Sequence, residues 1–394
     1  MHAPAKPSAP VALIHAALAM GGFAIGTTEF ATMSLLPYFA ADLRIDAPTA
    51  GHVISAYALG VVVGAPLLAV SAAKLARRTQ LLLLMTMFAL FNGLSAVAPT
   101  YHWMLLFRFL SGLPHGAYFG VAMLVAASLV PDNQRTQAVG RVMLGLTTAT
   151  IIGVPMANWL GQVVGWRWGF GVVALLSLLT VILVGLFAPR DRPHPETSPL
   201  TELGALANAR VWLTLAIGAI GFGGLFCVYT YLASTLLAVT GSPATMIPVV
   251  LAVFGVGMTV GSIVAPRFAD RALMPTAAGL LVWSAVSLLF YPLAARAFWS
   301  ICLDVFAIGF SGALGIVLQT RLMDVAGKAQ GLAAALNHSA FNTANALGPL
   351  LGGAAIAAGL GWTSTGWVGA LLALGGLAIL GLAVLFDRVQ AGRR

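Results

Sequence analysis

Three charged side chains lie deep inside the apolar segments of this chain: Glu29, Arg108 and Asp304. The sequence has 20 Lys and Arg residues and 11 Asp and Glu residues, and all the others fall in predicted loops, tails or segment ends. A charge near the centre of a bilayer costs about 2.5–3.5 kcal/mol on insertion scales. Such a charge is usually retained because it carries protons, ions or substrate, so these three residues are the first candidates for function.

The composition indicates a membrane protein. Apolar residues make up 60% of the chain and charged residues only 8%, which is too few charges to cover a soluble 394-residue domain. The hydrophobic runs also exceed the roughly 18 residues that mark a membrane-spanning helix. The net charge of +9 comes mostly from short loops, so it predicts no nucleic-acid partner. The lipid bilayer is the expected partner instead.

The apolar runs predict an all-α integral membrane protein with twelve spans. The first run, from Val11 to Leu36, is too long for the core of a cleaved secretion signal, so we interpret it as a retained span. The predicted spans are residues 12–38, 51–70, 80–98, 103–128, 139–163, 168–188, 211–238, 246–266, 274–295, 298–320, 331–357 and 366–386. Cys227 and Cys302 fall inside spans, without the spacing of a metal site or a disulfide framework.

Basic loop residues orient the spans. One side of the predicted topology carries Lys6, Lys74, Arg77, Arg78, Arg135, Arg141, Arg190, Arg192, Arg210, Arg267, Arg271, Arg321, Lys328, Arg388, Arg393 and Arg394. Only Arg44, Arg167 and Arg296 fall on the other side. This imbalance predicts that both termini and the mid-chain linker face the cytoplasm. We expect a tail at 1–11, a six-helix bundle at 12–188, a linker at 189–210, a second six-helix bundle at 211–386 and a tail at 387–394.

The two halves of the sequence repeat each other at an offset of about 196 residues. The corresponding pairs are Trp103 and Trp299, Trp166 and Trp362, Gly64 and Gly261, and Arg108 and Asp304. Agreement over several helices indicates an internal duplication, and two pseudo-symmetric bundles are the architecture of a secondary transporter.

Glu29 and Arg108 fall at similar depth in the first half. Glu29 lies past the midpoint of the first span, and Arg108 lies about one and a half turns into the fourth. Apolar surroundings and a nearby arginine act in opposite directions on the proton affinity of a carboxylate. Glu29 is therefore a candidate to take up a proton on one side of the membrane and release it on the other. The alternative is a permanent Glu29–Arg108 ion pair that holds helices together.

Asp304 and His115 each allow two interpretations. Asp304 is either a second protonation site or a polar anchor of the second half. His115 is either a proton relay or a hydrogen-bonding residue beside a close-packed stripe of Gly112, Gly116 and Gly120. The sequence favours the packing role for His115 and leaves the two roles of Asp304 open.

Two spans combine glycine with proline. The fifth span carries Gly145, Gly153, Pro155 and Gly161, and the eleventh carries Gly348, Pro349, Gly352 and Gly353. Glycine lets backbones approach closely and proline removes a backbone donor, so both spans are expected to form pliable, tight interfaces, unless this is only the ordinary enrichment of membrane helices. The eleventh span also carries Asn337, Asn342 and Asn345 loosely on one side, which suits either a water-lined cavity or hydrogen bonds between helices.

The sequence shows no feature of an ATP-driven transporter. There is no phosphate-binding loop that ends in Gly-Lys-Ser/Thr and no His/Cys cluster with metal-ligand spacing. Uphill transport is therefore expected to use an ion gradient and no cofactor, with protons as the natural ion and sodium as the alternative. A membrane-embedded enzyme would need a nucleophile–base or metal constellation, which the spans lack. A non-transporting receptor or scaffold is the other rival, and it would bind ligand without counterflow of protons.

The chain resembles the major facilitator superfamily, in its twelve-span drug:proton antiporter group, over roughly residues 12–388. Arg108-Phe109-Leu110-Ser111-Gly112 looks like the family motif whose arginine is implicated in proton coupling. Gly145 through Gly153, with Pro155 and Gly161, is similar to the antiporter motif of the fifth helix. Gly26-Thr27-Thr28-Glu29-Phe30, with Leu35-Leu36-Pro37, is similar to the first helix of chloramphenicol-efflux and arabinose-efflux type proteins.

One loop departs from the family pattern. The loop after the second span normally carries an Asp-Arg pair, but Ala73-Lys74 stands there in this chain. The second half keeps the pair as Asp270-Arg271. The basic residues of the first loop are therefore expected to set topology, and the gating role usually attributed to that loop is in doubt.

The resemblance implies proton-driven export by alternating access, by a monomer in the bacterial inner membrane, with Glu29, Arg108 and Asp304 biasing the two states. It also implies a mainly apolar central cavity, for which we expect a lining of Tyr57, His115, Tyr118, Phe119, Phe226, Tyr229, Asn337 and Asn342. Such a cavity suits small neutral or amphipathic molecules such as chloramphenicol. Export of sugars or nucleosides is the alternative, because polar groups on the seventh and eleventh spans could bind hydroxyls.

Overall fold

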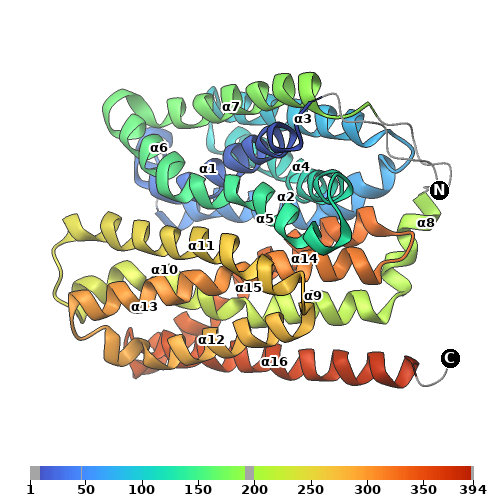
Figure 1. Cartoon of the computed structure of the whole chain (residues 1–394). Helices are drawn as coiled ribbons and strands as arrows, with labels where there is room; N and C mark the ends of the chain where they lie inside the picture. The colour runs from blue at the N-terminus through green and yellow to red at the C-terminus, as the bar shows by residue number, and fades with distance from the viewer. Residues whose placement is uncertain (1–8, 46, 191–198, 392–394) are drawn as a thin grey trace. The chain divides into compact units, whose positions relative to one another are not determined.

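The computed structural model describes residues 9–45, 47–190 and 199–391, and every regular element among them is a helix (Figure 1). Twelve helical stretches of the described residues are long and apolar enough to cross a bilayer. Their bounds are Val11–Met33, His52–Ser71, Arg77–Ala96, Tyr101–Ser128, Asp132–Ala157, Val163–Phe187, Ala209–Leu232, Ile247–Ala269, Leu273–Ala294, Phe298–Val325, Gln330–Leu360 and Ser364–Gln390. The predicted all-α membrane fold and its twelve spans are confirmed, with edges that move by several residues.

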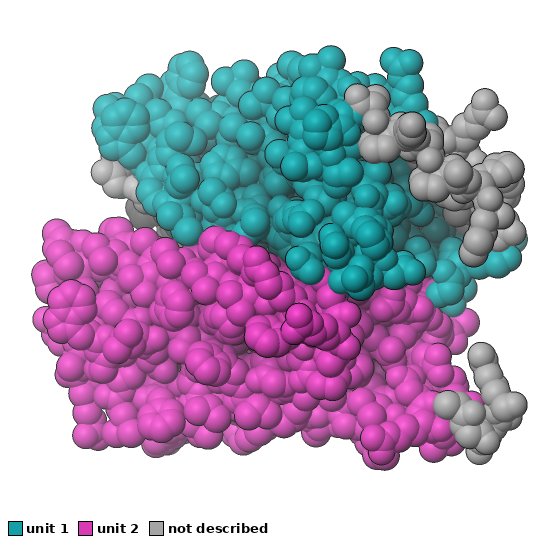
Figure 2. Space-filling view, in the orientation of Figure 1, with its two compact units in different colours: residues 1–205, 327–339 teal, residues 206–326, 340–394 magenta. Residues whose placement is uncertain are grey.

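The chain divides into two compact units, which Figure 2 colours separately. Among the described residues, unit 1 comprises those up to Ala205 together with Gly327–Ser339, and unit 2 comprises Leu206–Ala326 and those from Ala340 onward. The division differs from the predicted halves at 327–339, the start of the eleventh span, because that segment packs within unit 1.

Two predicted connecting segments contain helix. The linker predicted at 189–210 includes α8 (Pro199–Leu203) and η4 (Gly204–Ala207), where Glu202 and Ala205 are buried. The tail predicted at 387–394 is helical through Ala391, because α16 (Ser364–Ala391) continues past Asp387. The rest of the predicted tails, at 1–8 and 392–394, and the linker residues 191–198 lie outside the described residues.

Unit 1 is built on α1 (Val11–Leu43), α2 (Ala47–Ser71), α3 (Arg77–Ala96), α4 (Tyr101–Ser128), α5 (Arg135–Thr148), η2 (Ala149–Gly153), α6 (Val154–Leu160), η3 (Gly161–Gly165), α7 (Trp166–Phe187) and the first part of α15 (Gln330–Ala355). Helix α2 packs along α4, α3 packs against α4 and α7, and α1 packs against α5 and α7. Helix α4 is the most buried span, and this places its side chains at the centre of the unit.

Glycine allows α2 and α4 to touch through their backbones. A Cβ atom at Gly60 would lie 2.1 Å from the Phe109 carbonyl oxygen, and one at Gly112 would lie 2.2 Å from the Tyr57 carbonyl oxygen. A Cβ atom at Gly64 would likewise lie 2.1 Å from the Leu113 oxygen. Real Cβ atoms do not approach so closely, so the contact depends on glycine at all three positions, as is usual between membrane helices.

Unit 2 contains η6 (Ser311–Ala313), α16, the rest of α15, and α9 (Ala209–Gly221), α10 (Gly223–Ala238), α11 (Ile247–Ala269), α12 (Leu273–Ala294), α13 (Phe298–Phe310) and α14 (Leu314–Val325). Its α11–α13 contact repeats the α2–α4 contact. A Cβ atom at Gly257 would lie 2.2 Å from the Phe306 oxygen, and one at Gly309 would lie 2.4 Å from the Phe254 oxygen. The internal duplication is therefore visible in the packing of each unit.

The contact register corrects one predicted correspondence. Gly257 stands 197 residues after Gly60, and Phe306 stands 197 residues after Phe109. With this offset Arg108 corresponds to Val305, and Asp304 corresponds to Phe107. One residue turns a helix by about 100°, so Asp304 occupies a different face of its helix from the face that Arg108 occupies. The predicted pairing of Arg108 with Asp304 is wrong by one position, because aligning Trp103 with Trp299 gives an offset of 196 residues instead of 197.

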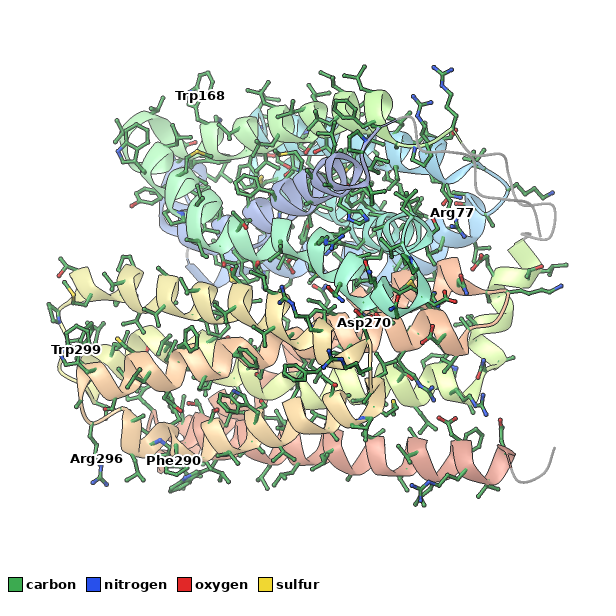
Figure 3. All side chains as sticks on the ribbon, in the orientation of Figure 1. Arg77, Trp168, Asp270, Phe290, Arg296 and Trp299 are labelled. Carbon is green, nitrogen blue, oxygen red and sulfur yellow. The ribbon has the colours of Figure 1, made fainter. Side chains whose placement is uncertain are left out.

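Polar and aromatic residues mark the ends of the helices within each unit. In unit 1, Arg77 begins α3 and Trp168 lies in the first turn of α7 at the opposite end of the helices (Figure 3). In unit 2, Asp270 follows α11, whereas Arg296 and Trp299 lie at the other end (Figure 3). Exposed tryptophans, including Trp168 and Trp299, are typical of the interface between membrane and water.

Candidate functional site

Arg108 is buried at the centre of unit 1, where only 1% of its surface is exposed. Its Nη1 donates hydrogen bonds to Thr28 Oγ1 at 3.0 Å and, at 3.4 Å, to Asn92 Oδ1 and Ser111 Oγ. Thr28 in turn donates to Asn92 Oδ1 at 2.9 Å. The guanidinium is thus held by neutral groups from α1, α3 and α4, which fixes its position without neutralising its charge.

Two aromatic rings complete the surroundings of the guanidinium. The Cζ atom of Arg108 lies 4.3 Å from the centroid of the Tyr57 ring and 5.3 Å from that of Phe170. These are cation–π distances, and such contacts are strongest where water is excluded. The Nε atom of Arg108 is buried without a hydrogen-bond partner among the described residues. The Nε–H group of Arg108 could therefore donate a further hydrogen bond, and the guanidinium charge would be stabilised by a nearby negative charge.

Glu29 lies beside this site on α1 and is partly exposed. Its carboxylate interacts electrostatically with Arg108 and Tyr57. It makes no direct ion pair with Arg108 among the described residues, since the guanidinium bonds to Thr28 instead. The permanent ion pair that the sequence left open is absent here. The geometry leaves the Glu29 carboxylate able to exchange a proton without first breaking a short ion pair.

Helix α1 is held against the fifth span by the glycines of the predicted conformational motif. A Cβ atom at Gly145 would lie 1.8 Å from the Ala19 carbonyl oxygen, and one at Gly153 would lie 2.1 Å from Thr27 Oγ1. At Gly161 a Cβ atom would meet the Leu35 side chain at 2.2 Å. The π-helix η2 ends two residues before Pro155, whose missing N–H interrupts the α-helical pattern. The motif thus sets the position of the helix that carries Glu29.

The second glycine–proline segment makes a matching contact in unit 2. A Cβ atom at Gly348 would lie 2.2 Å from the Gly223 carbonyl oxygen, and one at Gly352 would lie 2.6 Å from Cys227 Sγ. Tyr231 donates a hydrogen bond to the Pro349 carbonyl at 2.9 Å. The predicted close approach therefore exists at both segments, against α1 in unit 1 and against α10 in unit 2.

His115 joins Tyr57 to the eleventh span. Its Nδ1 lies 2.9 Å from the Tyr57 hydroxyl, and its Nε2 lies 3.3 Å from Nδ1 of His338. Phe119 stacks on the His338 ring with centroids 4.3 Å apart and an angle of 11° between the planes. The close approach that was predicted around Gly116 exists, because a Cβ atom there would lie 3.1 Å from the Ala335 carbonyl oxygen.

The predicted cavity residues fall into separate groups. In unit 1, Tyr57, His115 and Phe119 form the cluster just described, whereas Tyr118 donates to the Leu18 carbonyl at 2.8 Å and faces α1. Asn337 is buried in the same unit. In unit 2, Phe226 packs on Phe222, Tyr229 packs on Phe254, and Asn342 is buried. A single cavity lined by all eight residues stays a prediction.

Asp304 belongs to unit 2, whereas Arg108 belongs to unit 1. Its Oδ2 atom is buried without a hydrogen-bond partner among the described residues. Tyr291, which is fully buried on α12, interacts electrostatically with Asp304. Asp270, from the Asp270-Arg271 pair that resembles the family pattern, lies in the turn between α11 and α12.

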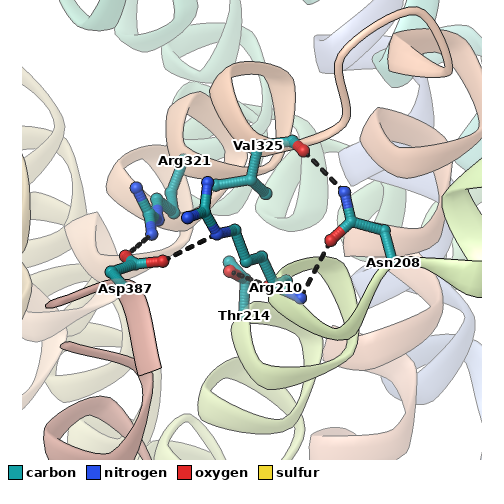
Figure 4. Close-up of polar contacts among 6 residues, drawn as sticks. All are labelled: Asn208, Arg210, Thr214, Arg321, Val325 and Asp387. Atoms are coloured by element: carbon teal, nitrogen blue, oxygen red, sulfur yellow. Dashed lines mark hydrogen bonds and ion pairs between the residues drawn. The ribbon is translucent and has the colours of Figure 1, made fainter. Parts of the chain in front are cut away.

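Sequence reasoning missed two ion-pair clusters at helix ends. In unit 1, Asp42 accepts hydrogen bonds from Arg167 and from Trp166 Nε1, the latter at 3.0 Å, and Arg167 also donates to the Ala98 carbonyl. The hydrogen bond from Arg167 lowers the pKa of Asp42 below its ordinary value, and the bond from Trp166 adds to this effect. In unit 2, Asp387 pairs with Arg321 and with Arg210, the latter at 2.9 Å (Figure 4). Both clusters tie together elements that are distant in sequence.

Glu202 in α8 was also missed. Its Oε2 accepts a hydrogen bond of 2.7 Å from the Leu332 N–H in the first turn of α15. Anions are stabilised at helix N-termini because the first N–H groups lack partners within the helix. Burial raises the pKa of the Glu202 carboxyl above its ordinary value, and the bond from Leu332 and the charge of Arg77 oppose that rise. A loop glutamate gives no sequence signal for such a contact.

Known proteins match this chain along almost its whole length. A profile of the Major Facilitator Superfamily matches residues 18–330. The chain is 40% identical over 366 residues to the inner membrane transport protein YdhP of Escherichia coli (strain K12), covering 92% of this chain and 93% of that protein. It is 34% identical to the chloramphenicol resistance protein of Streptomyces lividans, covering 94% of each. The structure of the Escherichia coli fucose:proton symporter FucP matches with a TM-score of 0.75 at 14% identity, over 95% of this chain and 98% of that chain.

Proposed function

Since this chain belongs to the Major Facilitator Superfamily and is therefore a membrane transporter, we propose that it exports small neutral or amphipathic compounds in exchange for protons. The observation that carries this proposal is the Glu29–Arg108 site. Arg108 is fully buried and bonded to neutral groups, while the nearby Glu29 residue is half-buried and its carboxylate makes no direct ion pair with Arg108.

Glu29 is the proposed proton carrier, and Arg108 is the fixed charge that favours release. When Glu29 is protonated, the positive charge of Arg108 is left uncompensated within the bilayer. When Glu29 is ionised, the two charges attract each other through low-dielectric surroundings. The two states of the carboxylate thus differ in electrostatic energy, and alternating access would couple that difference to movement of the two units.

Asp304 is proposed as a second titrating group in unit 2. Its buried oxygen lacks a hydrogen-bond partner among the described residues, which an ionised carboxylate tolerates poorly. Protonation would allow it to donate a hydrogen bond. Protons are proposed rather than sodium, since the described residues contain no group of three or more His, Cys, Asp or Glu side chains that could hold a metal ion.

The proposed substrate follows from the aromatic and apolar character of the predicted lining. Tyr57, Phe119, Phe226 and Tyr229 would offer ring faces to such a compound. The relative from Streptomyces lividans, named for chloramphenicol resistance, supports a neutral aromatic compound of that kind. We place the protein in a bacterial inner membrane with both termini in the cytoplasm, on the basis of the charged loops and the name of the Escherichia coli relative.

The test is substrate-driven proton movement in inverted vesicles with an acidified lumen. Chloramphenicol is added first, followed by a panel of sugars and nucleosides. Wild-type protein should release lumenal protons, and Glu29→Gln at equal protein level should not. An Asp42→Asn variant is the matched control, because it removes a carboxylate at the far end of the same helix. Proton release that survives in Glu29→Gln would move the carrier role to Asp304. Transport of substrate without any proton movement in wild type would contradict the coupling.

A further inference from the structure

A continuous hydrogen-bonded chain runs from the Arg108 site to the eleventh span. The Tyr57 hydroxyl lies 2.9 Å from His115 Nδ1, and His115 Nε2 lies 3.3 Å from His338 Nδ1. All three side chains belong to unit 1 and are at most 3% exposed. Water is therefore excluded from the chain, and its hydrogen bonds leave each member only a small number of possible arrangements.

The chemistry of imidazole restricts this chain to two polarities. A neutral histidine carries one N–H and one bare nitrogen. If Tyr57 donates to Nδ1 of His115, then Nε2–H of His115 must donate to Nδ1 of His338. If Tyr57 instead accepts from Nδ1–H of His115, every bond reverses. Both histidines then carry their hydrogen on the same kind of nitrogen, either Nε2 in both or Nδ1 in both.

We propose that Tyr57, His115 and His338 form a proton relay between the eleventh span and Glu29. The proposal rests on the proton coupling proposed above, and it assigns the route rather than the carrier. A reversible chain with two polarities is what transfer of one proton requires, because each transfer converts one polarity into the other.

The transfer balances without a co-reactant. A proton arrives at Nε2 of His338, whose Nδ1–H proton passes to Nε2 of His115. The Nδ1–H proton of His115 then passes to the Tyr57 oxygen, while the Tyr57 O–H proton passes to the Glu29 carboxylate. One proton enters and one leaves, both histidines end neutral, and Tyr57 keeps one hydrogen. The chain then has the opposite polarity, and a proton passed in the reverse direction restores the starting one.

The groups around the chain favour passage over storage of the proton. The positive charge of Arg108 on α4 lies 4.3 Å from the Tyr57 ring and opposes a proton that rests there. Glu29 on α1 is the acid that interacts electrostatically with Tyr57. On α15, His338 is stacked on Phe119, and a ring face stabilises a transient imidazolium. Tyr57 on α2 is the titratable group that is hydrogen-bonded to Nδ1 of His115.

Close packing keeps the two histidines within transfer distance. At Gly120 a Cβ atom would lie 2.8 Å from the Ala335 backbone nitrogen, and at Gly116 one would lie 3.5 Å from the His338 Cβ atom. Larger residues at these positions would push α15 away from α4. The glycine stripe and the relay are therefore linked, since the first sets the His115–His338 distance.

Three substitutions test the relay by removing proton transfer while retaining shape. Tyr57→Phe keeps the ring under Arg108, and His115→Asn and His338→Asn keep a polar atom near the Nδ1 position. Purified protein in liposomes is assayed for chloramphenicol-driven proton flux and, at equal pH on both sides, for exchange of labelled chloramphenicol. A positioned proton-transfer group contributes about 100- to 10,000-fold, so each variant should lower proton flux by at least about tenfold. Exchange should fall by a smaller factor, since Tyr57 and His115 are also predicted to line the cavity. His15→Asn, a buried histidine off the chain, is the control.

The combined variants separate a relay from independent contributions. A chain broken at one point cannot be broken further, so Tyr57→Phe with His338→Asn should be no slower than either change alone. Undiminished proton flux in the single variants, parallel loss of exchange, or multiplying losses in the double variant would each overturn the relay. Wild type that exchanges chloramphenicol without moving protons would instead contradict the proposed coupling itself.

A second measurement needs no transported substrate. Nitrogen-15 spectra of histidine-labelled protein report which ring nitrogen carries hydrogen, and single His→Asn variants assign the signals. The relay requires the same tautomer in His115 and His338. Opposite tautomers in the two rings would overturn it.

Discussion

Gly112→Ala tests whether the backbone contact between α2 and α4 holds the candidate site together. The new Cβ atom would lie 2.2 Å from the Tyr57 carbonyl oxygen, whereas real Cβ atoms stay beyond 3.0 Å. The two helices must therefore separate locally by at least 0.8 Å, the difference between these distances. If Tyr57 moves with its helix, its hydroxyl is carried from 2.9 Å to as much as about 3.7 Å from His115, which is too far for a hydrogen bond.

The expected cost is that of overpacking a tight interior, about 1–3 kcal/mol. For a unit of this size each kcal/mol lowers the melting temperature by about 2–4 °C, so a decrease of roughly 2–12 °C is expected. The assay is thermal unfolding of purified protein in detergent, with chloramphenicol-driven proton flux measured in parallel. Flux should fall together with stability, because the Tyr57–His115 bond is disturbed.

Gly279→Ala is the matched control. Gly279 lies within α12, and nothing lies within 4 Å of a Cβ atom placed there. Alanine favours helix over glycine by about 0.8–1.0 kcal/mol, so the control should keep or raise the melting temperature. An unchanged melting temperature in Gly112→Ala, or equal shifts in the two variants, would refute the argument that this contact excludes a side chain.

Three further changes probe the clusters at the helix ends. Asp387→Asn removes the partner of two arginines and should cost about 1.5–3 kcal/mol, whereas Arg388→Gln at the exposed neighbouring position should cost nothing measurable in the same thermal assay. Asp42 has a lowered pKa, so its contribution is present above the ordinary aspartate pKa of about 3.9 and is lost as pH falls through the native pKa. The stability difference between wild type and Asp42→Asn should shrink on acidification, and a constant difference from pH 7 to pH 3 would contradict this. Glu202 has a raised pKa, so the native state holds its proton more tightly, and stability should decline as pH rises from about 4.3 through the raised value. Glu202→Gln should remove that part of the slope, and an unchanged slope would count against the assignment.

The fold was predictable because the bilayer imposes it. Run length and loop charge specify spans without any knowledge of packing, and the twelve spans follow from them. The site was predictable only in part. Glu29 and Arg108 are conspicuous as charges in apolar runs, but the partners of Arg108 depend on which helix faces meet. Thr28 and Asn92 are uncharged, and their role emerges only when α1, α3 and α4 come together.

Charges at span ends were the weakest part of the sequence interpretation. Asp42 and Asp387 follow long apolar runs, so a charge there needs no explanation beyond exposure to water. The structure instead joins Asp42 to Arg167 and Asp387 to Arg321 across 125 and 66 residues of chain. The shift from an offset of 196 to 197 has a similar origin. A tryptophan at the membrane interface can shift by one residue along the chain and still lie in the interface. A glycine in backbone contact cannot shift, so it fixes the register.

The glycine contacts described for the two units have a consequence for evolution. Each unit presents the same arrangement of glycine against carbonyl oxygen, at Gly60 and Gly112 in one and at Gly257 and Gly309 in the other. In a library of all single substitutions, these positions should reject every larger residue, while neighbouring lipid-facing positions accept many. The internal duplication gives only a weak signal when the two halves are aligned by sequence. In the library it would appear as two matching sets of positions that tolerate no larger residue, 197 residues apart.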